Sequence, residues 1–164
     1  MSHGFCQYKT RAYVRINPIG LLEYINFQKE RYGSKTFCVN FSALPLYLQS
    51  EVIVFSLGHR LGTYICGKDV WWDYASDRIA RISFQNTAEA IEQYVFPWFE
   101  EISTENGYRN QLSNLGNKKL AAEWLNALEH TTDKETLITK VLLLLDYLKK
   151  YNEERHHYEK SNIS

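Results

Sequence analysis

The stretch at 24–44, YINFQKERYGSKTFCVNFSAL, decides the fold. Apolar and polar residues alternate on both sides of a turn-like RYGSK at 31–35. Alternation with a period of two is typical of a β-strand that buries one face, and a turn this short joins antiparallel neighbours. The stretch therefore predicts a β-hairpin with strands over 21–30 and 36–44.

The two faces of this hairpin differ in chemistry. One face carries apolar side chains, which we expect to point at the core: Ile25, Phe27, Phe37, Val39 and Phe41. The opposite face carries Tyr24, Asn26, Gln28, Cys38, Asn40 and Ser42. Amides both donate and accept hydrogen bonds, so this face is a candidate for binding a partner. The alternative is an ordinary solvated sheet face.

Further strands are predicted on both sides of the hairpin. AYVRI at 12–16 and the turn NPIG at 17–20 extend it to a three-stranded antiparallel meander. Pro45 ends the third strand, because proline has no N–H for the ladder. Residues 46–58 give no clear prediction. A second hairpin is predicted with strands over 59–65 and 69–75.

The second half of the chain predicts helices. Asn86 or Thr87 begins a helix whose apolar residues recur as far as Ile102, with a kink at Pro97. A second helix is predicted over 117–129. A capping box at 132–135 begins a third, whose apolar stripe predicts core positions that include Leu142 and Leu145.

Strands followed by helices predict an α+β fold. We expect an antiparallel sheet of about five strands in the N-terminal half, packed on one face by about three C-terminal helices. The prediction is a single domain over 1–151 and a polar tail over 152–164.

Composition argues against several classes of protein. The formal net charge is zero, whereas nucleic-acid binders are normally basic. Three widely spaced cysteines with no C-x-x-C pair argue against a zinc ribbon or a disulfide framework. The longest apolar run, VLLLL at 141–145, is far shorter than the roughly 18 residues of a membrane span. We expect a cytoplasmic protein without a cofactor.

Motifs for catalysis and metal binding are weak. GTYICGKD at 62–69 resembles a P-loop, but Asp69 replaces the final Ser or Thr and a predicted strand follows. His156 and His157 lack the i, i+4 spacing of a helical metal site. We therefore predict no metal site and no catalytic residues. The enzymatic alternative is a small hydrolase that uses His59 with Asp69 or Asp73.

Two adjacent tryptophans, Trp71 and Trp72, follow this motif. Neighbouring residues on a strand point to opposite faces, so one should enter the core and the other should join the amides. The predicted binding residues are therefore Tyr24, Asn26, Gln28, Asn40, Arg60, Trp71 and Trp72.

Four segments, YINFQKER, FCVNFSALP, HRLG and DVWW, resemble in this order domain-of-unknown-function family 4304, a mostly bacterial family. GFCQYKTRAYVRI at 4–16 resembles the opening strands of the family, and YVFPWFEEIS at 94–103 resembles its proline-containing helix. The resemblance covers about residues 4–110 and implies a fold, not an activity. The positions that match are Asn26, Phe27, Gln28, Lys29, Asn40, Arg60, Gly62, Trp71 and Trp72.

Members of that family carry a helix before the position of Gly4 and Phe5. Without it, we expect either that the helix is dispensable or that part of the sheet is covered by a partner, which makes a homodimer an option.

Three hypotheses for function follow. The leading one is a non-catalytic recognition domain that binds a protein partner, as an antitoxin-like or immunity-type inhibitor does. The alternatives are the small hydrolase and a protein that binds single-stranded nucleic acid by stacking.

Overall fold

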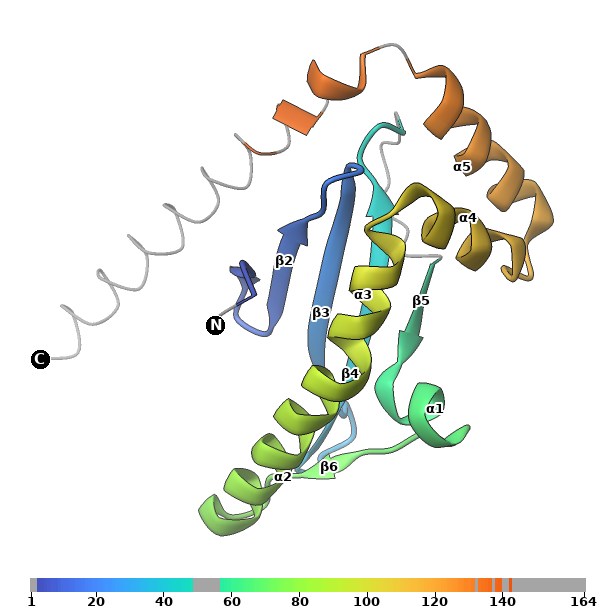
Figure 1. The fold of residues 1–164 in the computed structure, drawn as a ribbon. Coiled ribbons are helices and arrows are strands. Elements are labelled where there is room, and N and C mark those ends of the chain that lie inside the picture. Colours follow the sequence, from blue (N-terminus) through green and yellow to red (C-terminus); the bar gives the residue numbers. More distant parts are fainter. Residues whose placement is uncertain (1–2, 49–56, 132, 137, 140–141, 143–164) are drawn as a thin grey trace, which may run out of the picture.

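The computed structural model of the protein describes residues 3–48, 57–131, 133–136, 138–139 and 142. An antiparallel sheet forms one layer, and helices that follow it in the chain cover one of its faces (Figure 1). The predicted α+β class is therefore confirmed.

The strands of the sheet are β1 (Cys6–Lys9), β2 (Ala12–Ile16), β3 (Leu21–Lys29), β4 (Thr36–Pro45), β5 (Leu57–Arg60) and β6 (Trp72–Asp73). From β1 to β5 the sheet is a meander in which each strand pairs with the next. The order is β1-β2-β3-β4-β5, and β6 also pairs with β4. The predicted meander is confirmed. The turn between β2 and β3 is fixed by the Asn17 side chain, whose Oδ1 accepts hydrogen bonds from the backbone N–H groups of Ile19 and Leu21.

The predicted second hairpin is wrong. Residues 61–66 form the short helix α1 (Leu61–Cys66) instead of a strand, and Gly67 ends it in the left-handed conformation with φ of 70°. A short apolar segment suits a helix or a strand equally well, so its sequence period could not decide between them. Trp72 in β6 pairs with Phe37 of β4 instead of with residues 59–65.

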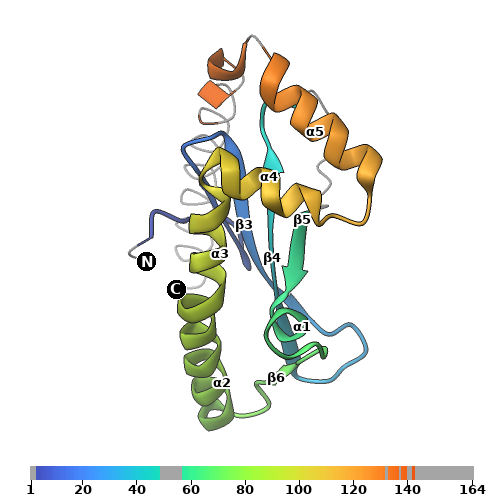
Figure 2. The ribbon, with the colours of Figure 1, turned by 45° about the vertical axis from the view of Figure 1, so that its right-hand side comes forward.

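Between residues 77 and 130 the chain forms five helical segments, and Figure 2 shows α2 and α3 running one after the other along the sheet. They are α2 (Asp77–Ala90), the π-helical turn η1 (Ile91–Val95), α3 (Phe96–Ile102), α4 (Glu105–Ser113) and α5 (Lys118–His130).

The structure differs from the sequence prediction at the start of α2 and near Pro97. The predicted start at Asn86 or Thr87 is wrong, because α2 begins nine or ten residues earlier, where the Ser76 side chain accepts from the backbone N–H of Ile79. The prediction at Pro97 was a kink, and the structure has the wider π-helical turn η1, which ends at Val95, two residues before the proline. Proline has no N–H for the carbonyl four residues earlier, and a π turn is a common response to such a gap.

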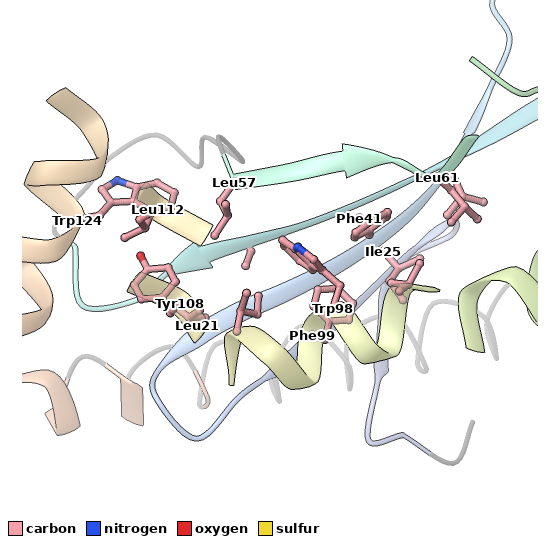
Figure 3. Packing of buried hydrophobic residues seen from close by; sticks show 14 of the residues in the cluster. Leu21, Ile25, Phe41, Leu57, Leu61, Trp98, Phe99, Tyr108, Leu112 and Trp124 are labelled. Atoms are coloured by element: carbon pink, nitrogen blue, oxygen red, sulfur yellow. The ribbon is translucent and has the colours of Figure 1, made fainter. Parts of the chain in front are cut away.

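The core lies between the sheet and α3, with α4 and α5 closing one end (Figure 3). Ile25, Phe37, Val39 and Phe41 are buried and Phe27 is partly buried, as the alternation predicts. Cys38 and Ser42, which the sequence placed on the opposite face, are buried as well, so that face is not exposed along its whole length. Ring contacts join the two layers: the centroid of Phe41 lies 5.2 Å from that of Trp98 and 6.2 Å from that of Phe99.

The predicted apolar stripe of the third helix is only partly described. Leu142 is 49% exposed, so its assignment to the core is wrong. Leu145 and the tail at 152–164 lie outside the described residues. Within the described part of the chain, no helix is both long enough and apolar enough to span a membrane.

Candidate recognition face

Strand register brings the predicted amides together on the face of the sheet that points away from the core. Asn26 of β3 lies directly opposite Asn40 of β4, and Asn40 lies directly opposite Arg60 of β5. Residues two apart on a strand share a face, so Tyr24 and Gln28 lie on the same side. We term Tyr24, Asn26, Gln28, Asn40, Arg60 and Trp71 the amide face.

Hydrogen bonds connect these side chains across three strands. The Asn40 Nδ2 donates to Gln28 Oε1 at 3.0 Å, and Arg60 Nε donates to Asn40 Oδ1 at 3.4 Å. On the same strand, Asn26 Nδ2 donates to the Tyr24 hydroxyl at 2.9 Å. The amides therefore hold one another in fixed orientations on the surface of the sheet.

Asp69 extends this row to Trp71. Its Oδ2 accepts from Arg60 Nη1 in an ion pair and from Trp71 Nε1 at 3.0 Å. The Arg60 guanidinium also lies 5.3 Å from the centroid of the Trp71 ring, within the range of a cation–π interaction. From the sequence, Asp69 was considered only as a catalytic group. Its position between Arg60 and Trp71 could not be predicted, because it depends on the helix α1, which brings residue 69 close to Arg60.

Trp72 does not belong to the amide face. Its ring stacks on Phe37 on the helix-covered side, with centroids 6.0 Å apart. The predicted division of the two tryptophans between opposite faces is therefore confirmed, and the structure assigns Trp71 to the outer one. All of the other predicted binding residues gather there.

A polar hollow of about 810 Å³ adjoins the amide face and includes Tyr24, Asn26 and Gln28 in its walls. Four cations also line it: Lys9, Arg11, Lys29 and Arg31. Its carboxylate, Glu30, is engaged in the turn, where Oε2 accepts from the backbone N–H groups of Tyr32 and Ser34. These bonds lower the pKa of Glu30. The sequence did not reveal this cluster of cations. Lys9 and Arg11 are far from Lys29 and Arg31 in the sequence, and the turn between β1 and β2 brings them beside the end of β3.

The groups of the hydrolase hypothesis do not meet. His59 contacts the rings of Tyr64 and Trp98 on the helix-covered side, with centroid distances of 4.9 Å and 5.6 Å. Asp69 is bound to Arg60 on the opposite face, and Asp73 accepts from the backbone N–H of Ala75. Partial burial lowers the pKa of His59. The described residues contain no group of three or more His, Cys, Asp or Glu side chains that could hold a metal ion.

Comparisons with curated proteins and with solved structures gave no match. A comparison with protein families matched residues 1–101 to the domain of unknown function DUF4304. That range is more than half of the chain and contains the whole amide face together with Asp69. The chain therefore belongs to the DUF4304 family.

Proposed function

We propose that this domain is a non-catalytic recognition module that binds a protein partner through the amide face. The observation that carries the proposal is the continuous row of contacts from Gln28 through Asn40, Arg60 and Asp69 to Trp71. Tryptophan, tyrosine and arginine dominate the binding energy of protein interfaces, and the amide face presents one of each.

The row supports binding because it orients side chains before a partner arrives. Ordering a flexible side chain at an interface costs about 0.5–1.5 kcal/mol, and a side chain that is already fixed avoids part of this cost. The amide face also keeps hydrogen-bond donors that its own contacts do not use. Within the described residues, Gln28 uses only its Oε1, so its amide N–H groups are available to a partner.

The polar hollow indicates the chemistry of the partner. None of its four cations forms an ion pair with another described residue. Because the formal net charge of the chain is zero, these cations are a local concentration of positive charge. We therefore expect the partner to place acidic side chains against the hollow.

An antitoxin-like or immunity-type inhibitor is the specific form of this proposal. Such a protein acts by occupying a surface of its target, so it needs a binding face and no catalytic residues. The amide face meets that requirement.

The test is affinity capture from native cells with the double variant Asn26→Ala and Asn40→Ala. We expect capture of the partner to be lost, while the free energy of unfolding falls by only about 1–2 kcal/mol, as for a few partly exposed hydrogen bonds. The control is Asn86→Ala with Asn110→Ala, which removes two exposed amides from α2 and α4. The control should retain the partner.

Two outcomes would contradict the proposal. The first is equal capture of the same protein by both double variants. The second is capture that disappears on nuclease treatment and weakens steeply with salt, which would favour the nucleic-acid hypothesis.

A further inference from the structure

A second candidate site lies on the other face of the sheet, between α2 and strands β2 to β4. Two neighbouring hollows of about 200 Å³ and 450 Å³ share Tyr13, Phe27 and Phe84 as walls. We term the two hollows together the aromatic groove. The combined volume of the two hollows falls in the range of about 300–1,000 Å³ that is usual for small-molecule sites.

Most of the side chains that α2 buries or places in the groove are small. The residues that α2 buries are Ser83 and Thr87, and Ala88 lines the smaller hollow. The large residue on this side of α2, Phe84, stacks on Phe37 at 5.1 Å and is still 51% exposed. A phenylalanine that is half exposed at the edge of an open hollow is an apolar surface that a ligand can cover.

Ring contacts hold the walls in place. The centroid of Phe27 lies 6.1 Å from that of Tyr13 and 6.0 Å from that of Phe37. These side chains belong to three neighbouring strands, so their positions are set by the sheet. The groove is therefore formed before any ligand binds.

The two ends of the groove differ in charge. Arg11, Lys29 and Thr10 line the larger hollow. Neither Arg11 nor Lys29 forms an ion pair with a described residue, although the Lys29 Nζ lies 5.1 Å from the centroid of the Tyr74 ring. At the smaller hollow, the carboxylate of Glu92 is already paired with His3 at 3.1 Å. The groove thus combines apolar walls with two available cations at one end.

We propose that the aromatic groove binds a small organic anion with an extended apolar body, whose anionic group contacts Arg11 and Lys29. The walls suit an alkyl chain or an aromatic ring, and the cations select a carboxylate or sulfonate over an amine. The groove shares Arg11 and Lys29 with the polar hollow, but none of the amide-face residues lines it, so this proposal does not rest on the protein-binding role.

The test compares three probes of equal chain length by titration calorimetry: decanoate, decanol and decylammonium. We expect decanoate to bind about fivefold or more tightly than decanol, which corresponds to a well-placed exposed ion pair, and decylammonium to bind most weakly. Arg11→Glu should remove the advantage of decanoate. Arg78→Glu, which reverses an exposed charge on α2 that lines neither hollow, should preserve it.

A filling variant tests the location. Ala88→Phe places a ring in the smaller hollow and should abolish binding of decanoate, with melting and circular dichroism showing an intact fold. If this variant does not fold, aromatic NMR signals of the unaltered protein decide: decanoate should shift those of Tyr13, Phe27 and Phe84. Equal affinity for all three probes, no binding, or shifts confined to other aromatic residues would overturn the proposal.

Discussion

Glu23 is a fully buried carboxylate on the helix-covered side of β3. Its Oε2 accepts from Arg15 Nε at 2.6 Å, while its Oε1 has no partner among the described residues. Burial raises the pKa of Glu23 to about 7, although the attraction of Arg15 acts in the opposite direction. At the scale of single residues, this group gives the fold its clearest dependence on pH.

The stability of the protein should fall as the pH rises from about 4.5 to about 7. In this window the folded state holds a proton on Glu23 that the unfolded chain has released, so raising the pH favours unfolding. The full pKa difference corresponds to roughly 3 kcal/mol. Urea denaturation of the protein and of Glu23→Gln, measured from pH 4 to 8, checks this.

The comparison isolates the carboxyl group, because the amide of Glu23→Gln does not titrate. Groups such as Glu129, whose pKa is lowered by Arg109, contribute equally to both proteins. The stability of the wild-type protein should therefore fall relative to the variant as the pH rises. A difference that stays constant from pH 4 to 8 would show that Glu23 keeps an ordinary pKa in the folded state.

At the scale of elements, the short helix α1 positions two residues that contact Arg60 of the amide face, Asp69 and Trp71. Leu61 is fully buried in the core, and Gly62 lies so close to the next segment that a Cβ would sit 2.5 Å from the backbone nitrogen of Val70. This close approach places Asp69 and Trp71 beside Arg60. The glycine of the HRLG segment thus has a physical role: it allows α1 and residue 70 to touch.

We expect Gly62→Ala to destabilise the protein by about 1–3 kcal/mol, the usual cost of overpacking. The contacts include the backbone nitrogen and the Cβ of Val70, which cannot move aside as the end of a flexible side chain would. The variant should also move Trp71 away from Arg60 and shift its fluorescence. Gly116→Ala is the matched control, because a Cβ there meets nothing within 4 Å. Equal melting temperatures for the two variants would contradict the prediction.

At the scale of the whole molecule, one sheet separates two chemically different surfaces. The outer side carries the hydrogen-bonded amide face, and the helix-covered side leaves the aromatic groove open beside α2. Arg11 and Lys29 line both the polar hollow and the groove, so the two surfaces meet at one end of the sheet.

Variants distant from this shared end should separate the two proposed activities. Trp71→Ala should weaken capture of the protein partner and leave the affinity for decanoate unchanged. Ala88→Phe should abolish the binding of decanoate and leave capture of the protein partner unchanged, because residue 88 lines the aromatic groove on the helix-covered side of the sheet. Parallel capture and calorimetry on both variants check this, and the loss of both activities in either variant would contradict the independence of the two surfaces.

The sequence alone determined the meander and which of its side chains share a face. Ile25 and Val39 point to the core and Asn26 and Asn40 point away from it, because the side-chain alternation of a strand is a local property with a period of two. The same rule predicted that Trp71 and Trp72 would separate. These features needed no knowledge of the distant parts of the chain.

Only the tertiary structure decided the rest. It assigned Trp71 to the outer face, joined Asp69 to Arg60, and placed Arg11 beside Lys29. It also showed that residues 61–66 are helical and that α2 begins at Asp77. The physical reason is that short segments fit more than one secondary structure, and the energy of packing against distant residues selects among them.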